Sequence, residues 1–466
     1  MRALLFVTAG LLAANLLACA ATPDPMPEPK SESVSGSASE AASSSPGETP
    51  RAQSAPVQTP TEVLSEVATQ PEATPSGLPV QRGLPPEMRF SLWKDAFVAE
   101  MTHRYPTEAV RDMLLGLEFQ PQLLERDTSQ PEFTRPVWSY LDGAIKPSRV
   151  EPGRENLSAF GSVFDAVEAR YNVDREVLTA IWGLESQYGT IMGDAPVPSA
   201  LATFAFEGRR KAMFTSQLEA LVKLVAEGKL DPEGLVGSWS GAMGMTQFMP
   251  LTMQDYAVDF DGNGRIDLRG SEADALGSAA HYLARSGWVP GQPAMVEVVL
   301  PEGFDYGLAD GQTQRRAEDW AALGVVPIRP SNASTVFPGN VAFEEAKLLV
   351  PAGARGPAFL TFKNFEAILR YNRSTSYAMA IHGLAETFKG NRPVVRDWPR
   401  GDEPLSFEDK KRLQQRLSEL GYDPGGVDGI VGAGTRRAVR AWQRANGLPA
   451  DGYVEQGLFR RILGAG

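Results

Sequence analysis

The sequence contains few of the side chains that bind transition metals or form disulfides. Among its 466 residues Cys19 is the only cysteine, and the three histidines, His103, His281 and His382, are far apart in the chain. A single cysteine cannot form a disulfide within the chain, and no group of cysteines and histidines has the spacing of a zinc site or a Cys/His nucleophile pair. Any catalysis must therefore depend on carboxylates or hydroxyls, and we expect no organic cofactor.

An excess of basic charge is also lacking. The formal net charge is −12 at pH 7, and the isoelectric point is near 5.0. Because a nucleic-acid binder needs a basic surface to neutralise phosphates, this composition argues against a nucleic-acid partner. Hydrophobic residues make up 42% of the chain. That content and the length are sufficient for two or three domains with sizeable cores.

The N-terminus carries a long apolar run over residues 3–17. It follows a basic residue and is too short for an ordinary membrane span, which is typical of a secretory signal. The run ends in Leu-Leu-Ala-Cys at residues 16–19, which resembles a bacterial lipobox. We therefore expect a lipoprotein signal peptide over residues 1–18 and lipidation of Cys19 in the periplasm, with Ala20 favouring the outer membrane. The alternative is an ordinary signal peptide and an incidental thiol.

Residues 19–82 have a different composition. Proline, serine, threonine, alanine and glutamate dominate, and apolar residues are few. Such a segment cannot bury enough apolar surface to fold, so we predict a disordered tether.

Helical periodicity begins close to residue 83. Apolar residues recur every three or four positions from Phe90 to Met101, and similar patterns follow in later segments. Three short runs are rich in β-formers and are bounded by proline and glycine: residues 295–300, 346–350 and 358–362. The sequence therefore predicts a mainly α (α+β) domain with a small inserted β subdomain.

One helical stretch, residues 177–189, carries a single carboxylate on an apolar face. Residues three, four and seven apart stack on a helix, so Ile181 and Trp182 share a face with Glu185. We expect Asp174 to cap this helix and Gly189 to end it.

That position predicts an altered acidity for Glu185. It would lie in the last turn, where burial and the negative end of the helix dipole both disfavour the ionised form and raise the pKa. A carboxyl that is protonated near neutral pH is suited to general acid catalysis. The alternative is a buried glutamate paired with an arginine.

Two further stretches concentrate hydrogen-bonding groups. Residues 237–250 combine turn-forming glycines with Ser238 and Gln247, and Trp239 or Phe248 offers a flat apolar face, a mixture that suits a sugar site. The alternative is a glycine-rich helix start over a Met/Phe core. Residues 371–377 place two tyrosines and an asparagine close together. They are equally consistent with carbohydrate contacts and with cap and surface positions.

Residues 259–267 match the start of a calcium-binding loop. Oxygen-bearing side chains at alternate positions are followed by the glycine and the backbone carbonyl that such a loop needs. The late bidentate glutamate is replaced by Gly270, so closure would have to come from Asp267, Glu272 or Asp274. The sequence thus predicts a structural Ca²⁺, with a bare Asx-rich turn as the alternative.

A linker over residues 396–404 leads into a compact module over residues 405–464. Ser406 begins a capping box, and Thr435 is expected to cap a second helix. A weak repeat is visible in the two Asp-Gly pairs at 428–429 and 451–452. A domain of this size usually binds rather than catalyses.

Taken in this order, these stretches resemble the membrane-bound lytic transglycosylase B family, lysozyme-like enzymes that cleave peptidoglycan. The resemblance covers residues 83–395 and is carried by residues 181–189, 241–250, 371–380 and the loop that starts at Asp259. The tail is similar to a three-helix peptidoglycan-binding module, with Gly457 where that family often has threonine.

The resemblance implies roles for individual residues. Glu185 would be the single catalytic acid/base, and Asp274 would complete the calcium loop, although one extra residue precedes it here. The implied glycan-binding residues are Ser238, Gln247, Tyr371, Asn372, Tyr377, Arg209, Arg210 and Tyr140. The implied metal ligands are Asp259, Asp261, Asn263, the carbonyl of Arg265 and Asp274. The implied partners are peptidoglycan strands and, through a lipid anchor, the outer membrane; no synthase or divisome partner is identified.

A standard glycosidase uses two carboxylates, and no second one is marked here. Glu207 and Glu219 have helix-surface positions, and Asp194 falls in a loop. The N-acetyl group of the substrate could replace the missing nucleophile, and the product would then carry a 1,6-anhydro ring. Two rival interpretations are a goose-type lysozyme-like hydrolase of the same bond and a non-catalytic peptidoglycan-binding scaffold.

Overall fold

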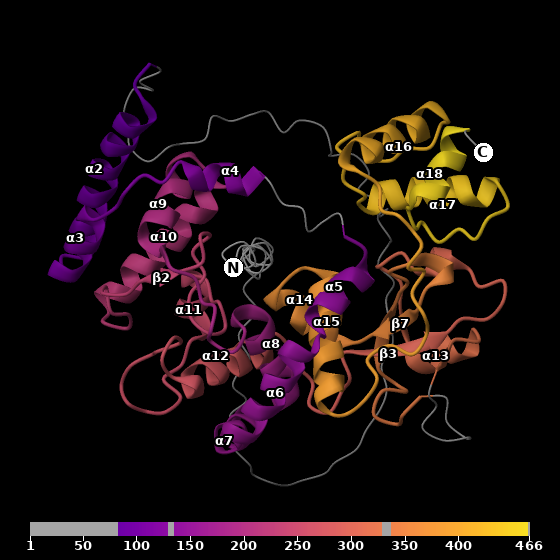
Figure 1. Ribbon diagram of the computed structural model, residues 1–466, viewed down its shortest axis with the longest axis horizontal. Helices are drawn as coiled ribbons and strands as arrows, with labels where there is room; N and C mark the ends of the chain where they lie inside the picture. The colour runs from indigo at the N-terminus through magenta and orange to yellow at the C-terminus, as the bar shows by residue number, and fades with distance from the viewer. Residues whose placement is uncertain (1–82, 129–134, 329–336, 465–466) are drawn as a thin grey trace, which may run out of the picture. The chain divides into compact units, whose positions relative to one another are not determined.

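The computed structural model describes residues 83–128, 135–328 and 337–464 (Figure 1). The predicted signal peptide, Cys19 and the tether lie outside the described residues. Within the described ranges we find no helix with the length and apolarity that a membrane crossing requires.

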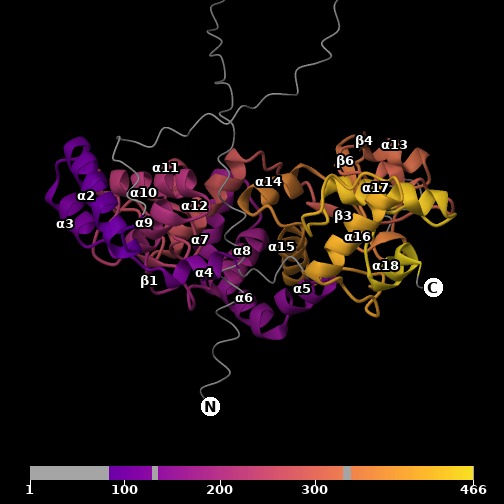
Figure 2. The same cartoon turned by 90° about the horizontal axis from the view of Figure 1, so that it is seen from above.

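Helices dominate the described residues, as the sequence predicts (Figures 1 and 2). In chain order they are α2 (Pro86–Arg104), α3 (Glu108–Leu115), α4 (Gln122–Thr128), α5 (Val137–Ala144), α6 (Pro147–Ala159), α7 (Gly161–Tyr171), α8 (Arg175–Ser186), α9 (Val197–Glu207), α10 (Lys211–Ala226), α11 (Pro250–Tyr256), α12 (Glu272–Arg285), α13 (Ala317–Ala322), α14 (Lys363–Tyr371), α15 (Thr375–Phe388), α16 (Phe407–Glu419), α17 (Ala433–Ala445) and α18 (Gln456–Leu463), with short 3-10 turns η3 (Tyr306–Leu308) and η4 (Gly353–Arg355).

A small antiparallel sheet is inserted between α12 and α14. Its strand order is β4-β6-β7-β3-β5. The strands are β3 (Met295–Val299), β4 (Gln314–Arg316), β5 (Val326–Pro327), β6 (Glu345–Leu349) and β7 (Ala358–Thr361), and a separate pair is formed by β1 (Ala195–Pro196) and β2 (Val236–Gly237). The three predicted β runs are confirmed as β3, β6 and β7. The edge strands β4 and β5 were not predicted.

Three hydrophobic cores support these elements. The largest joins α2–α12 with α14 and α15, a second lies beneath the sheet around Trp320, and a third lies in the module formed by α16, α17 and α18. Helix α8 is central to the first core, because every residue from Val177 to Ser186 is buried. It packs against α6, α12 and α15.

The ends of α8 differ in detail from the sequence prediction. Asp174 does occupy the N-cap position, but its side chain accepts no hydrogen bond from the helix and instead contacts Lys389 Nζ at 3.1 Å. The helix stops at Gln187, whose φ of 50° is left-handed, rather than at Gly189. The prediction of Gly189 as the stop is therefore wrong, although Glu185 remains in the last turn.

The caps of the C-terminal module are partly as predicted. The Ser406 hydroxyl accepts from Asp409 N, which confirms the first cap. Thr435 is not a cap: α17 starts after Gly432, and the buried Thr435 hydroxyl accepts from Gln414 Nε2 at 3.1 Å. In α18 the Glu455 carboxylate accepts from two backbone amides and caps the helix, so the helix has a cap although residue 457 is glycine.

Candidate active site

Glu185 lies in the last turn of α8 and is almost completely buried, with 3% of its surface exposed. Helix α15 crosses α8 and brings Tyr377 to it from 192 residues away in sequence. Ser374 caps α15 by accepting from the Tyr377 amide, which fixes the first turn that carries the tyrosine. The Tyr377 hydroxyl donates to Glu185 Oε1 at 2.7 Å.

This environment favours the protonated form of Glu185. Burial raises its pKa from 4.5 to about 7, and the hydrogen bond from Tyr377 opposes this only in part. No other acidic or basic group contributes to the shift. Among the described residues no arginine or lysine forms an ion pair with Glu185, so the alternative of a buried Glu–Arg pair is not supported. A carboxyl with these properties can both give and take a proton near neutral pH.

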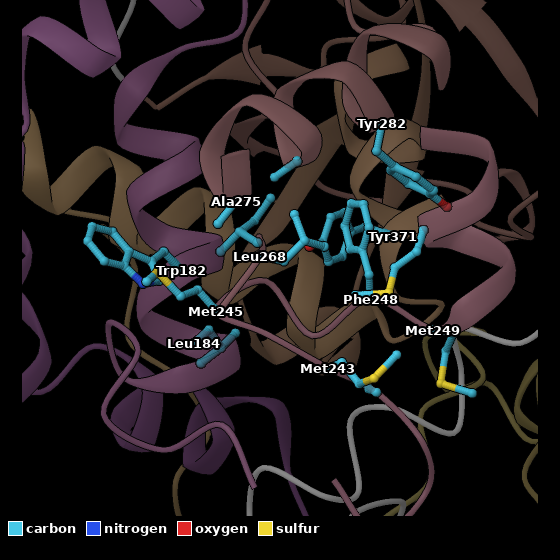
Figure 3. Packing of buried hydrophobic residues seen from close by; sticks show 14 of the residues in the cluster. Trp182, Leu184, Met243, Met245, Phe248, Met249, Leu268, Ala275, Tyr282 and Tyr371 are labelled. Atoms are coloured by element: carbon cyan, nitrogen blue, oxygen red, sulfur yellow. The ribbon is translucent and has the colours of Figure 1, made fainter. Parts of the chain in front are cut away.

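The glycine-rich loop is tied directly to the end of α8. Ser186 donates to the carbonyl of Met245 at 2.6 Å and accepts from Gly189 N at 2.9 Å. Gly244 has a φ of 76°, and a Cβ there would lie 2.6 Å from the Leu268 carbonyl oxygen, so a side chain cannot be accommodated. The loop therefore runs close beside Glu185 in a fixed position. Figure 3 shows Met245 next to Trp182 of α8.

Gln247 and Ser238 are both held within this loop. Gln247 adopts a left-handed φ of 52°, and its side-chain amide donates to the carbonyls of Met192 (3.1 Å) and Gly244 (2.8 Å). The donor end of Gln247 is thereby engaged. Ser238 accepts from Ala242 N at 3.0 Å. Both side chains shape the loop itself.

Tyr371 joins the loop to the end of α14. Its hydroxyl donates to the carbonyl of Thr246 at 2.6 Å, and its ring packs beside Phe248 and Tyr282 (Figure 3). Asn372, directly after it, is buried and accepts from Ser374 N at 3.1 Å. The structure therefore brings Tyr371 of α14 to the glycine-rich loop and Tyr377 of the next helix, α15, to Glu185.

Three other residues of the predicted site have different surroundings. Arg210 packs over the ring of Phe214, and Arg209 is exposed. Tyr140 lies in α5, near Arg149. Phe248 is only 2% exposed, so it is a core residue and not the flat sugar platform that the sequence suggested.

Sequence reasoning missed Arg149, which supports the end of α8. This buried guanidinium donates to the carbonyl of Gly183 at 3.0 Å and to the carbonyl of Ala144 at 2.6 Å. The Tyr188 hydroxyl donates to the Arg149 carbonyl at 2.7 Å. No local motif marks Arg149, because its partner in α8 is 34 residues away.

Of the three other acids considered in the sequence, Asp194 is exposed, and the two glutamates have basic partners. Glu207 accepts from Arg89 at 3.1 Å, and Glu219 lies 3.7 Å from Arg104. Both are engaged in ion pairs at the surface of the first core. The described residues thus provide one carboxyl, Glu185, in an environment that alters its acidity near neutral pH without a neighbouring charge.

The predicted calcium loop has a folded geometry that fits a divalent cation. Carboxylate oxygens of Asp259, Asp261 and Asp274 all lie within 4.8 Å of one another. Asp267 is turned away and accepts from the amides of Arg269 and Gly270. Three carboxylates at this spacing repel one another, and a hard cation with oxygen ligands would relieve that repulsion. Of the three candidates for closure, Asp274 is the one that joins this group.

Comparisons with known proteins show the families to which parts of this chain are similar. The family described as Transglycosylase SLT domain matches residues 89–386, and a peptidoglycan binding domain family matches residues 408–462. The chain is 35% identical over 250 residues to membrane-bound lytic murein transglycosylase B of Escherichia coli. That alignment covers 53% of this chain and 66% of the relative, just under two thirds of its length.

Solved structures are similar as well. SltB3 from Pseudomonas aeruginosa, in complex with NAG-NAM-pentapeptide, is 46% identical with a TM-score of 0.76, covering 80% of this chain and 99% of that chain. The Escherichia coli lytic transglycosylase Slt35, in complex with calcium, is 29% identical with a TM-score of 0.54, covering 64% of this chain and 92% of that chain.

Proposed function

Because the chain belongs to the transglycosylase SLT domain family, we propose that it is a lytic transglycosylase of peptidoglycan. It cleaves the β-1,4 bond between N-acetylmuramic acid (MurNAc) and N-acetylglucosamine and leaves 1,6-anhydro-MurNAc ends. The predicted lysozyme-like fold with a peptidoglycan-binding module is confirmed by the structural similarity. We assign catalysis to residues 83–395, the linker to 396–404 and glycan retention to 405–464.

The observation that carries the proposed mechanism is the buried Glu185, whose pKa burial raises to about 7. Its hydrogen bond from Tyr377 occupies Oε1, which leaves Oε2 to hold the proton that faces the scissile bond. Because no second carboxylate of the described residues contributes to the surroundings of Glu185, the substrate itself must supply the nucleophile. The acetamido oxygen of MurNAc can do so, because the acetamido group is attached to the carbon next to the anomeric carbon.

The reaction then proceeds in two balanced steps. In the first, the acetamido oxygen attacks the anomeric carbon, and Glu185 gives its proton to the departing glycosidic oxygen. In the second, the Glu185 carboxylate removes the proton from the C6 hydroxyl. The C6 oxygen attacks the anomeric carbon and displaces the acetamido oxygen. The 1,6-anhydro ring closes, Glu185 is protonated again, and no water is consumed.

The other predicted residues have supporting roles in this proposal. Gln247, held by its amide donors, keeps its carbonyl oxygen for a substrate N–H, and Ser238, Tyr371 and Asn372 fix the loop that lines the glycan. Tyr377 orients Glu185 rather than contacting sugar, since it is fully buried. Arg209, Arg210 and Tyr140 contact the substrate farther from the bond that is cut.

Product analysis tests this function directly. Purified sacculi incubated with the protein should release muropeptides that end in 1,6-anhydro-MurNAc, as read by mass spectrometry. Reducing MurNAc ends would instead support the goose-type hydrolase. No released product, with binding to sacculi intact, would support the non-catalytic scaffold, although the intact and acidity-shifted Glu185 argues against that interpretation.

Two accessory properties complete the proposal. A structural Ca²⁺ would be held by Asp259, Asp261, Asn263, Asp274 and the carbonyl of Arg265, where it would rigidify the loop that precedes α12. Calcium should therefore raise the unfolding temperature of the metal-free protein, whereas magnesium should do so less because it prefers smaller octahedral sites.

We also propose that the chain is lipidated on Cys19 and anchored to the outer membrane. The tether over residues 19–82 would let the catalytic part reach the glycan. The relative from Escherichia coli is named membrane-bound, which supports this assignment. Cys19→Ala should move the protein from the outer-membrane fraction to the soluble periplasmic fraction, and an unchanged distribution would refute the anchor.

A further inference from the structure

A cavity of about 680 Å³ lies between the C-terminal module and the segment that starts α5. We call it the basic cavity. Its wall includes Phe407, Lys410 and Arg436 from the module, and Trp138 and Arg209 from the catalytic part. Its volume falls in the range of small-molecule and peptide pockets. It is separate from the Glu185 cluster, with which it shares no residue.

Specific contacts hold the two walls of the basic cavity together. The Asp451 carboxylate accepts from the amide of Ala354 in η4 at 2.8 Å through one oxygen and from Gln443 at 2.7 Å through the other. A Cβ on Gly353 would overlap Asp451, so glycine is needed for this close approach. Arg355 adds an ion pair with Asp402 at 2.7 Å. The module is therefore docked by directional bonds.

The charge of the basic cavity is opposite to that of the whole chain. Four lining residues are basic, Arg135, Arg209, Lys410 and Arg436, and none is acidic, although the chain carries a net charge of −12. Neither Lys410 nor Arg436 has a side-chain hydrogen bond or ion pair among the described residues. A carboxylate that entered the cavity would therefore find both side chains available as donors.

The surroundings of these two cations lower their pKa values. Burial lowers the pKa of Lys410, and burial together with the nearby charge of Arg440 lowers the pKa of Arg436. Arg436 is exposed and Lys410 is half-buried, so both face an accessible space and not a sealed core. The Asp451 carboxylate offsets the charge around Arg436 in part. An anion that enters this space would add a further counter-charge and gain charge-assisted hydrogen bonds.

Much of the rest of the wall is apolar. Phe407 is 49% exposed and Ile430 is 65% exposed, whereas Trp138 and Leu405 are largely buried. A ligand that matches this wall carries carboxylates on a partly apolar body. A small inorganic anion would leave the apolar part uncovered, and a neutral sugar would leave the cations without partners.

We propose that the basic cavity binds the stem peptide of peptidoglycan, with its carboxylates on Lys410 and Arg436. This rests on the proposed function, because peptidoglycan is the polymer that presents short acidic peptides beside the glycan. The peptide is held by a surface to which the module and the catalytic part both contribute. The module therefore selects glycan that still carries peptides and keeps it near Glu185.

The test uses the full chain and a free stem pentapeptide, titrated and followed by NMR or calorimetry. The wild-type protein should bind the peptide, and the same peptide with amidated carboxyl groups should bind at least about tenfold more weakly. A double variant, Lys410→Met with Arg436→Met, should show the same loss. The matched control is Arg437→Met with Arg460→Met, which removes two exposed positive charges outside the cavity.

The outcomes separate this inference from the proposed function. Equal binding of the acidic and amidated peptides, no binding by the wild type, or an equal loss in the control variant would overturn the assignment. Binding of inorganic phosphate or anionic vesicles in place of the peptide would also overturn it. Formation of anhydro products from peptide-free glycan strands by the double variant would show that its fold and catalysis are intact. Absence of those products from the wild type would count against the proposed function alone.

Discussion

Two buried carboxyl groups of the catalytic part, Glu185 and Asp274, differ in the number of hydrogen bonds that they accept. Their helices, α8 and α12, pack against each other, and the exposed fractions are 3% and 0%. Within the described ranges, Glu185 receives one hydrogen bond, from Tyr377. Asp274 receives three, from the amides of Phe260, Asp261 and Asp267, at 2.7, 3.3 and 2.8 Å.

The two surroundings offset burial to different extents. Burial raises the pKa of both groups; three N–H donors oppose the rise at Asp274, whereas one hydroxyl opposes it at Glu185, whose pKa reaches about 7. Three donors suit a carboxylate that organises a loop, and one suits an acid that exchanges a proton near neutral pH. The following variants change one side of this comparison at a time.

The largest effect is expected from Glu185→Gln. The amide keeps the size of the side chain and can still accept from Tyr377, but it cannot transfer a proton. Release of anhydro-muropeptides should fall by roughly 10²–10⁴-fold. The control is Glu207→Gln, which alters a surface ion pair and should leave turnover unchanged. Activity close to wild type in the Glu185 variant would end the proposed mechanism.

The same variant should change the pH dependence of stability. The folded pKa of Glu185, about 7, is above the unfolded value of 4.5. The folded state therefore binds the proton more tightly, and wild-type stability is lost as pH rises between these values. Glu185→Gln lacks this loss. Its unfolding free energy relative to wild type should grow by up to about 3 kcal/mol from pH 4.5 to 7 and then stay level.

That difference is best measured by chemical unfolding of both proteins across the pH range. Subtracting the wild type removes the contribution of His382, whose pKa burial lowers to about 4 in both proteins. A difference that does not depend on pH would show that Glu185 is ionised in the folded protein.

On the other side of the comparison, Asp274→Asn should destabilise the loop by about 2 kcal/mol. The three amides would then face a neutral group, part of which is a donor. Thermal unfolding with and without calcium measures both the loss and the metal response. Asp267→Asn is the matched control, because its exposed carboxylate binds only the next turn. A full calcium response in the Asp274 variant would contradict the ligand assignment.

The smallest effect is expected from Tyr377→Phe. Removing the one donor to the ionised form raises the pKa of Glu185, so the alkaline limb of kcat/KM should move up by about one pH unit. Tyr371→Phe is the control, since that hydroxyl bonds to the Thr246 carbonyl and not to the acid. If the alkaline limb of kcat/KM stayed in place in the Tyr377 variant, the hydrogen bond from Tyr377 would not influence the pKa of Glu185.

The lone acid could be predicted from the sequence because its signals are local. The 3.6-residue pattern, the neighbouring glycine-rich stretch and the Asx-rich loop all lie within short windows. The same is true of β3, β6 and β7, whose β-branched and aromatic residues form continuous runs. The edge strands β4 and β5 are too short, at three and two residues, to produce such a pattern.

The details that failed depend on contacts across the fold. The helix stop moves to Gln187 because Tyr188 fills a slot between Gly153 and Gly183, at each of which a Cβ would lie 2.5 Å from its hydroxyl. Arg149 accepts that hydroxyl on its carbonyl and donates to α8 with its guanidinium. Neither arrangement follows from propensity, since the partners are brought together only when α6 packs on α8.

The raised pKa of Glu185 has a consequence for inhibitor design. A positively charged sugar mimic that imitates the cationic transition state needs an anionic partner, and below pH 7 it would meet a mainly neutral acid. Its affinity should therefore increase as pH rises through 7 and then level off. A neutral mimic that accepts a hydrogen bond from the acid should show the reverse trend, and would be the better starting scaffold for an acidic compartment.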